Sequence, residues 1–402
     1  MNIFIVPLWY PSKHYPIVGT FIKEQAVAIA KHDPDTNIGL SIWGQYEDEY
    51  LLWVKDHVRN FSKLLFTKRN SKQVKLAPNL TEYHHPTFTW TNTFLQGNLN
   101  QIVKANLNNA KAFELEYGKI DLIHAHPGYI AGAIALQLSQ ILGVPYIITE
   151  HLGLFPGPIM SDKSGNIKRR YKLPYLKSQL NITVSPHLDD LMLQQGIPNR
   201  VIVPNFLDED LFTVKPGNRH NETNFTFLTV ACINPEKGVD LLLKAIQIAS
   251  KTHNNIKLRI AGTGPYLEEY KTLANTLGIS SITTWLGEIS RTEVVQELQH
   301  CNAFVLPSQF ESMGIAYVEA LACGKPIIAT KCGGPEFTVN DNNGILVEHH
   351  TPKAVANAML QIISSYSKYD KKTIREDFIK RFSKAAIIPK ILDLYSKVTS
   401  NA

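Results

Sequence analysis

Residues 303–330, AFVLPSQFESMGIAYVEALACGKPIIAT, spell out one complete unit of an α/β fold. The apolar run AFVL predicts a buried strand, and the residues from Ser308 to Glu311 predict a turn. A helix is expected from about Ser312 to the glycine stop at Gly324, and PIIA begins the next strand. Because the strand segment does not alternate apolar and polar residues, it suits a parallel sheet covered on both faces.

The same alternation of strand and helix recurs along both halves of the chain. It predicts two α/β domains, residues 1–205 and residues 225–381, joined by a polar, turn-rich linker at 206–224. The strands of each domain are expected to form a parallel sheet. Two such domains joined once form a cleft between the carboxyl ends of their sheets, which is where ligands bind in this architecture.

Composition excludes several classes of protein. Among 402 residues, 44% are hydrophobic and 19% charged, as in soluble globular proteins. The sequence contains no run of eighteen apolar residues, so no membrane-spanning helix is expected. The N-terminal MNIFIVPLWYP lacks the basic region of a signal peptide. The net charge of +6 favours anionic substrates or a lipid surface, whereas no nucleic-acid recognition motif is present. The four cysteines have no C-x-x-C pairing and predict reduced, mostly buried thiols of a cytoplasmic protein: Cys232, Cys301, Cys323 and Cys332.

Two acids flank the predicted helix start, Glu311 just before it and Glu319 farther along. The amides of Met313, Gly314 and Ile315 would have no intrahelical acceptor, and the helix dipole adds positive potential there. A glycine at this place lets an anion such as a phosphate approach the backbone. The two acids therefore bracket a site for an extended anionic ligand. The alternative is that Glu311 merely stabilises the helix dipole and Glu319 is a solvated acid.

The longer stretch 307–347 resembles the signature of the family-4 retaining glycosyltransferases. The matching features are the proline–serine pair, the two glutamates eight positions apart, EALACGKPIIA, GGPEF and NGILV. Further similar segments, among them VACINPEKGVDLLLKAI, IAGTGP, LGEIS and VPNFLDEDLF, extend the resemblance over nearly the whole chain. It implies the GT-B fold, two facing Rossmann-like domains with an interdomain cleft. It also implies that the C-terminal helix 382–402 crosses back to complete the first domain.

The resemblance also implies roles for individual residues. Glu311 contacts the donor sugar and Glu319 holds the ribose hydroxyls, with the amides from Ser312 to Ile315 near the sugar and diphosphate. Lys237, in the segment EKG, neutralises the diphosphate. The chain departs from the family at Cys232, which stands where an arginine is usual, so the diphosphate loses one cationic partner.

Other implied contacts fall on loops after predicted strands. His126 matches a family histidine that approaches the donor sugar, with His124 competing for the assignment. Gly19 matches a glycine close to the transferring sugar and phosphate, and Glu288 and Ile289 match the segment that meets the base. The catalytic residues expected on this basis are Glu311, His126 and Lys237. The alternatives are a structural histidine, a plain turn glycine and a surface lysine.

Further features bear on the acceptor. Glu150 and His151 are expected to line its side of the cleft. The basic and apolar segment 55–75 predicts peripheral contact with an anionic membrane, and 168–177 offers the same chemistry; the alternative is a solvated basic face. The DED at 208–210 is interpreted as part of the linker rather than as a metal-binding D-x-D motif, so no metal site is expected.

These observations predict a cytoplasmic enzyme, peripheral at the inner face of the cell membrane if the basic segments bind lipid. It would transfer a hexose or N-acetylhexosamine, with retention, from a nucleotide-diphosphate sugar to a hydroxyl of a glycan or lipid-linked acceptor. The expected pathway is synthesis of cell-surface polysaccharide or glycoconjugate, with UDP donors favoured over GDP donors and no cofactor or obligatory metal. The alternatives are a catalytically silent GT-B partner or sugar-nucleotide-binding protein, and a sugar-nucleotide epimerase.

Overall fold

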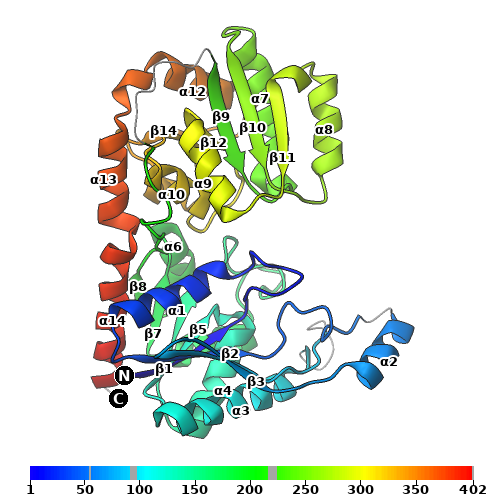
Figure 1. The fold of residues 1–402 in the computed structure, drawn as a ribbon, viewed down its shortest axis with the longest axis vertical. Coiled ribbons are helices and arrows are strands. Elements are labelled where there is room, and N and C mark those ends of the chain that lie inside the picture. Colours follow the sequence, from blue (N-terminus) through cyan, green and yellow to red (C-terminus); the bar gives the residue numbers. More distant parts are fainter. Residues whose placement is uncertain (54–55, 91–96, 216–223, 401–402) are drawn as a thin grey trace. The chain divides into compact units, whose positions relative to one another are not determined.

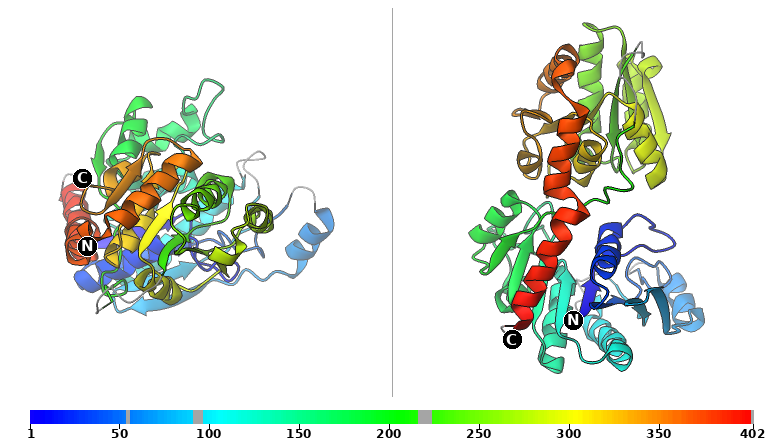
Figure 2. Two further views of the ribbon diagram at one scale, coloured as in Figure 1. Left: turned by 90° about the horizontal axis from the view of Figure 1, so that it is seen from above. Right: turned by 60° about the vertical axis from the view of Figure 1, so that its left-hand side comes forward.

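The structure, a computed structural model, describes residues 1–53, 56–90, 97–215 and 224–400. The chain divides into two compact units (Figures 1 and 2). Unit 1 comprises residues 1–184, 189–203 and 388–402, and unit 2 comprises residues 185–188 and 204–387. Each unit is an α/β fold built on its own sheet.

Unit 1 contains an eight-stranded sheet in the order β3-β4-β2-β1-β5-β6-β7-β8, parallel except for β3, which pairs antiparallel with β4. The strands are β1 (Asn2–Pro7), β2 (Asn37–Ile42), β3 (Lys72–Ala77), β4 (Leu80–His84), β5 (Leu122–His126), β6 (Tyr146–Glu150), β7 (Leu180–Thr183) and β8 (Arg200–Ile202). The helices are α1 (Thr20–His32), α2 (His57–Phe66), α3 (Leu99–Tyr117), the π-turn η2 (Gly128–Gly132), α4 (Ala133–Leu142), α5 (Arg169–Lys177) and α6 (Pro186–Gln194).

Helices cover both faces of this sheet: Figure 1 shows α1 on one face and α3 with α4 on the other. Every residue of β5 is buried, as are all of β1 after Asn2. Strands buried on both faces explain why these segments are almost continuously apolar in the sequence.

Unit 2 contains a six-stranded, wholly parallel sheet in the order β11-β10-β9-β12-β13-β14. The strands are β9 (Phe225–Val230), β10 (Ile256–Ala261), β11 (Thr283–Gly287), β12 (Ala303–Leu306), β13 (Ile327–Thr330) and β14 (Gly344–Val347). The helices are η3 (Pro235–Lys237), α7 (Val239–Ser250), α8 (Leu267–Thr276), η4 (Ser280–Ile282), α9 (Arg291–His300), α10 (Ile315–Ala322), α11 (Pro335–Thr338), α12 (Pro352–Ser364), η5 (Tyr366–Lys368) and α13 (Lys371–Phe382). The last helix, α14 (Lys384–Ser400), begins in unit 2 and ends in unit 1.

The structure corrects the predicted linker 206–224. Its first part, residues 206–215, packs into unit 2, because Leu207 forms a β-bridge with Ser383 and Phe212 is fully buried. The burial of Leu207 and Phe212 thus fixes this segment in unit 2, although its composition is polar and had predicted a linker. Residues 216–223 of the predicted linker lie outside the described residues.

The DED segment anchors the start of α14. The carboxylate of Glu209 accepts the amides of Lys384 and Ala385 at 2.9 and 3.2 Å, and Lys384 Nζ donates to Asp208 at 2.8 Å and to Asp210 at 2.5 Å. Burial opposes ionisation of Asp208, but the ion pair with Lys384 prevails and lowers its pKa. An acidic group at a helix N-terminus is stabilised by the unpaired amides and the dipole. The three acids therefore have a structural role.

The cysteine prediction was only half right. Cys301 and Cys323 are buried, but Cys332 is partly exposed and Cys232 is exposed. Strand β9 ends at Val230, so Cys232 lies in the loop after its carboxyl end, where side chains face solvent.

Candidate active site

The turn between β12 and α10 is shaped by Gly314. Its φ of 79° and ψ of 72° are left-handed, and a Cβ there would lie 2.4 Å from the ring of the buried Tyr317. The helix consequently begins at Ile315 and not near Ser312 as predicted, because residue 314 is not helical. The sequence pattern located the helix but not the backbone reversal that starts it.

A second glycine turn packs against this one. The amide of Gly334 donates to the carbonyl of Glu311 at 2.8 Å, and Glu311 forms a β-bridge with Gly333. A Cβ on Gly334 would lie 2.5 Å from the Cα of Met313. The sequence analysis noted GGPEF as a motif but assigned these glycines no role; their function is to let two loops meet without side chains between them.

Two side chains converge on one oxygen of Glu311. Lys237, 74 residues earlier in the chain, places Nζ 2.7 Å from Oε1, and the Ser308 hydroxyl donates to the same atom at 2.9 Å. Glu311 is 9% exposed. Among the described residues, none donates a hydrogen bond to Oε2. One carboxylate oxygen is therefore held in place while the other remains open to a ligand.

Lys237 is itself positioned by backbone geometry. It ends the short helix η3, whose N-cap Asn234 accepts the Lys237 amide at 3.2 Å. The next residue, Gly238, has a φ of 65°, and a Cβ there would lie 2.1 Å from the carbonyl oxygen of Pro307. This close approach brings η3 against the end of β12, which places the lysine beside Glu311.

Donor groups also face this region from the main chain. Within the part of the chain that the structure describes, no acceptor receives the amides of Met313, Gly314 and Ile315. Ile315 is the first residue of α10, so the positive end of the helix dipole lies here too. The arrangement is suited to an anion.

The second acid, Glu319, lies on α10 and is half-buried. Its Oε1 is 3.9 Å from Nη2 of Arg291, the first residue of α9, which the sequence analysis did not single out. The signal was available, because Arg291 directly follows the segment LGEIS. Glu288 and Ile289 lie in the loop between β11 and α9, where Glu288 is exposed and Ile289 half-buried.

In unit 1, Gly19 is a tightly packed glycine. It precedes α1 with a φ of 72°, and a Cβ there would lie 2.3 Å from the carbonyl of Trp9. The loop after β1 therefore folds back on the start of α1, and no residue with a Cβ fits at this position without movement.

Three histidines form a buried column at the carboxyl ends of β5 and β6. His126 Nδ1 lies 2.9 Å from His151 Nε2, and the rings of His126 and His124 are 4.0 Å apart. His124 contacts Tyr395 and Thr149, each at 2.7 Å. Burial lowers the pKa of His124 and of His151 to about 3, and it lowers that of His126 well below the usual value, so all three are neutral.

This column bears on the choice between His124 and His126. His126 is fully buried, and its Nε2 has no hydrogen-bond partner among the described residues, whereas both nitrogens of His124 are engaged. His126 therefore has a ring nitrogen left without a described partner, whereas His124 has none. Nδ1 of His151 is likewise buried without a partner in the described chain.

Glu150 is fully buried and serves the architecture of unit 1. It accepts the amides of Gly128, His151 and Leu152 at 3.2, 2.8 and 2.9 Å and the hydroxyl of Tyr175. Burial raises the pKa of Glu150, although these four donors oppose the rise. The sequence analysis placed Glu150 on the acceptor side; the structure shows that its oxygens are already occupied.

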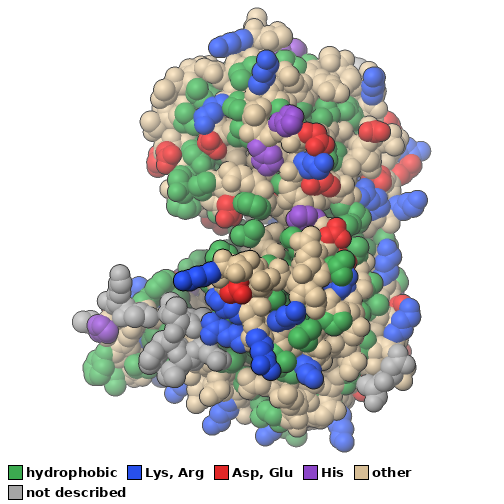
Figure 3. Space-filling model, turned by 180° about the vertical axis from the view of Figure 1, so that it is seen from behind, with side chains coloured by type: hydrophobic (Ala, Val, Ile, Leu, Met, Phe, Trp, Pro, Cys, Tyr) green, Lys and Arg blue, Asp and Glu red, His purple; other side chains and the backbone are tan. Residues whose placement is uncertain are grey.

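Helix α2 exposes an unusual number of apolar side chains. Phe61, Leu64, Leu65 and Phe66 are 65%, 53%, 60% and 77% exposed, beside the basic Arg59, Lys63, Lys68 and Arg69. Residue 55, the first of the predicted segment, lies outside the described residues. Figure 3 shows a face of the molecule on which basic side chains outnumber acidic ones over unit 1. The whole net charge of +6 belongs to unit 1. This unit has 22 Lys and Arg against 16 Asp and Glu, whereas unit 2 has 19 basic and 19 acidic residues.

Two features are absent from the described residues, a membrane-spanning helix and a cluster of metal ligands. None of the helices there has the length and apolarity required to cross a bilayer. No group of three or more His, Cys, Asp or Glu side chains is arranged to hold a metal ion in the same residues.

The structure thus assembles two groups of predicted residues, each within one unit. In unit 2, Lys237, Glu311 and the amides of 313–315 come together. In unit 1, His126 lies with His124 and His151. Gly19, Glu288 and Ile289 lie on loops after strands, as predicted.

Two α/β domains, each built on a mainly parallel sheet, have the architecture of the GT-B fold. Solved structures share it: sucrose-phosphate synthase from Thermosynechococcus elongatus has a TM-score of 0.74 at 18% identity over 100% of this chain and 99% of its own. Anabaena HepE, in complex with UDP and glucose, has a TM-score of 0.69 at 19% identity over 98% and 99%.

Two family models match the chain, Glycosyltransferase Family 4 over residues 66–211 and Glycosyl transferases group 1 over residues 210–381. The chain belongs to the group 1 glycosyltransferases and is a transferase enzyme. Curated relatives agree. An uncharacterized glycosyltransferase of Methanocaldococcus jannaschii is 28% identical over 71% of this chain and 78% of its own length. A D-inositol 3-phosphate glycosyltransferase of Thermobifida fusca is 26% identical over 75% and 76%.

Proposed function

We propose that this glycosyltransferase moves a hexose or N-acetylhexosamine from a nucleotide-diphosphate sugar, with retention, to a hydroxyl of a glycan or lipid-linked acceptor. The observation that carries the proposal is the carboxylate of Glu311, with Oε1 held by Lys237 and Ser308 and Oε2 open. An open, fixed carboxylate oxygen can accept a hydroxyl of the donor sugar. The expected pathway is synthesis of cell-surface polysaccharide or glycoconjugate.

The leaving group is the other requirement of the chemistry. A departing nucleotide diphosphate gains negative charge, and preorganised donors stabilise that charge without reorganisation. Lys237 and the amides of Met313, Gly314 and Ile315 would supply them, with Glu319 at the ribose. Because Lys237 and these amides would stabilise the charge of the diphosphate, the reaction would not depend on an obligatory metal. In a retaining front-face transfer, the acceptor hydroxyl gives its proton to the departing phosphate, so no strong general base is required.

The choice of UDP over GDP as the favoured donor is supported by a structural relative. HepE was solved with UDP and glucose, and it shares the fold over nearly the whole of both chains. Cys232 replaces the cation that the family resemblance leads one to expect, so Lys237 carries more of the diphosphate charge here. If the site has lost donor binding, the chain is instead a silent partner of another transferase.

Thermal melting tests the donor site. At a hundredfold excess over Kd, a ligand that binds one site in the native protein stabilises it by about 2.7 kcal/mol. We expect a shift with UDP or a UDP-sugar that EDTA does not remove, and no equal shift with GDP or ADP. Glu311→Ala should abolish transfer of the sugar, whereas Glu269→Ala, an exposed acid on α8, should not. If no nucleotide shifts the melting curve, the silent-partner alternative replaces the proposal.

We further propose a cytoplasmic location with peripheral contact to an anionic membrane through the described part of 55–75. The support is the exposed apolar face of α2 beside basic residues, a combination that binds anionic interfaces. Co-sedimentation with vesicles containing phosphatidylglycerol should exceed that with phosphatidylcholine alone. Phe66→Ser should reduce it, whereas Leu115→Ser, at a 90% exposed position on α3, should not. Equal sedimentation of both variants would contradict the contact.

A further inference from the structure

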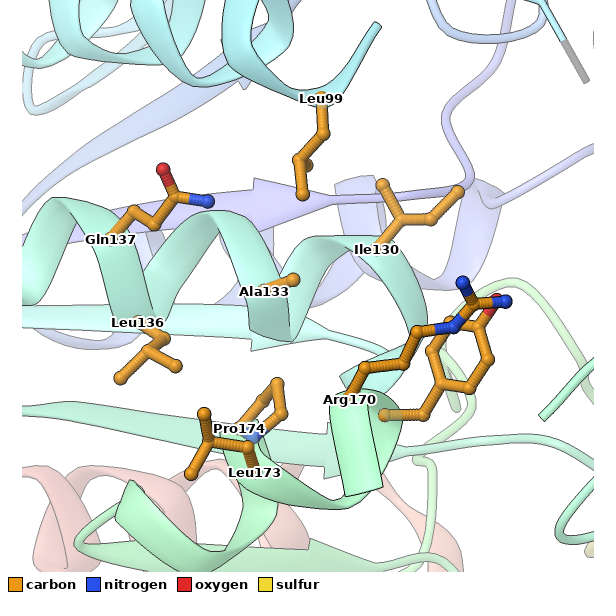
Figure 4. Close-up of a pocket in the computed structure, with 10 residues that line it drawn as sticks. Leu99, Ile130, Ala133, Leu136, Gln137, Arg170, Leu173 and Pro174 are labelled. Carbon is orange, nitrogen blue, oxygen red and sulfur yellow. The ribbon is translucent and has the colours of Figure 1, made fainter. Parts of the chain in front are cut away.

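An apolar pocket opens in unit 1. It has a volume of about 220 Å³ and lies between η2, α4 and α5, beside the start of α3. Figure 4 shows Leu99 and Ile130 facing Leu173 and Pro174 across Ala133. The polar groups are at its ends, with Gln137 at one and Arg170 at the other.

The walls of the pocket are fixed by a buried network. A Cβ on Gly128 would lie 2.1 Å from the ring of Tyr175, so η2 and α5 are in direct contact. The carboxylate of Glu150 binds both, through the Gly128 amide and the Tyr175 hydroxyl. The rings of Tyr129 and Tyr171 also pack together, with their centroids 5.6 Å apart. The pocket is therefore preformed in the free protein.

The backbone beside the pocket is strained. Ile130 has a φ of 58° and a ψ of −61°, which is a rare conformation for a β-branched residue. Such strain persists where the surroundings over-determine it, and it is enriched at ligand clamps. Here it holds the Ile130 side chain in the lining of the pocket.

The mouth of the pocket is positively charged. The guanidinium of Arg170 lies 4.6 Å from the ring centroid of Tyr171, and no described carboxylate forms an ion pair with it. The segment 166–177 contains Lys168, Arg169, Lys172 and Lys177 as well, and no acid. An apolar pocket with an unpaired arginine at its end is complementary to a hydrocarbon chain that carries an anionic head group.

We propose that this pocket binds the first part of the hydrocarbon chain of a lipid-linked acceptor, with the phosphate of the lipid against Arg170. A cavity of about 150 Å³ lined by apolar side chains holds a benzene molecule, and sites for drug-sized ligands span about 300–1,000 Å³. A volume of about 220 Å³ thus fits a chain segment and not a whole lipid. This inference rests on the proposed function, in which the acceptor is lipid-linked.

Calorimetry with three probes tests the pocket: decyl phosphate below its critical micelle concentration, decanol and inorganic phosphate. Decyl phosphate should bind with one site per chain. Ala133→Phe fills the pocket and should weaken this binding at least tenfold. Its matched control Gln140→Phe, at an exposed position of α4 outside the lining, should not. Arg170→Gln should weaken the binding of decyl phosphate about tenfold, because it removes a charge-assisted hydrogen bond to the phosphate. The binding of decanol should be unchanged.

Several outcomes would overturn the inference. Equal binding of decyl phosphate to Ala133→Phe and to the natural chain would place the probe elsewhere. Inorganic phosphate binding as tightly as decyl phosphate would mean that the chain contributes nothing. Arg170 is exposed, so Arg170→Gln should fold even if Ala133→Phe does not. Melting the same samples with UDP keeps the two proposals apart: a UDP shift without decyl phosphate binding refutes only the pocket, whereas a missing UDP shift refutes the donor site.

Discussion

The contact between Lys237 and Glu311 allows stability and donor binding to be separated by a double-mutant cycle. Lys237→Met removes one of two donors to a carboxylate that is 9% exposed, so we expect a loss of about 1–3 kcal/mol of unfolding free energy. The same variant should weaken UDP binding about tenfold or more, since a charge-assisted contact to the diphosphate is lost. Glu311→Gln added to Lys237→Met removes the unpaired charge, and Gln retains an oxygen for Ser308.

The double variant should therefore regain most of the lost stability but none of the UDP affinity. Urea unfolding followed by circular dichroism measures the first quantity, and calorimetry with UDP measures the second. Hydrogen exchange in peptides covering 303–324 should report the change locally. UDP affinity equal to that of the natural chain in Lys237→Met would refute the role of the lysine. A double variant no more stable than the single one would refute the energetic argument about the buried carboxylate.

Two further predictions concern the backbone and pH. Gly314 has a φ of 79°, and a Cβ there would clash at 2.4 Å, so Gly314→Ala should lower the free energy of unfolding by about 3 kcal/mol or more and abolish UDP binding. Gly278 has a φ of 69° but no atom within 4 Å, so its control variant Gly278→Ala should lower the free energy of unfolding by only about 1–2 kcal/mol. Thermal melting measures both losses. The lowered pKa values of His124, His126 and His151 give stability that is fully present above about pH 6.5 and lost as the pH falls toward 3. Three protons taken up on unfolding should give a slope of up to about 4 kcal/mol per pH unit near pH 5, and urea midpoints that stay constant from pH 6.5 to 5 would contradict this.

Much of the fold was predictable because strand burial leaves a direct trace in the sequence. Runs such as AFVL are apolar at every position, and all four residues of β12 are buried. The family resemblance placed Lys237 and Glu311 at one donor site but did not predict their direct contact. The contact is possible because both residues follow parallel strands whose carboxyl ends lie at one edge of the sheet. In contrast, the first half of the linker was wrong, because Leu207 and Phe212 are buried although the stretch around them is polar.

The details of the site depended on features that no local pattern records. The start of α10 is set by the left-handed Gly314, whose conformation depends on the packing of Tyr317 against it. The burial of His126 depends on His151, which is 25 residues away in sequence. The role of Glu150 as a network centre depends on Tyr175, at the same separation. In the two cases in unit 1, the deciding partner is a tertiary contact.

The geometry at Glu311 suggests how Glu311 and Lys237 together can contact a sugar hydroxyl and a diphosphate without the arginine that Cys232 replaces. An ammonium group has three donors, and Glu311 Oε1 occupies one of those on Lys237, so two remain for phosphate oxygens. Because the lysine and Ser308 share Oε1, Oε2 can accept from a sugar hydroxyl at the same time. Under the proposed function, the lysine therefore need not leave the glutamate when a diphosphate arrives, and it would hold the carboxylate in position against the sugar. On this reasoning Cys232 costs the site one charge but not its orientation, since the orienting contacts all lie between η3, the end of β12 and the start of α10.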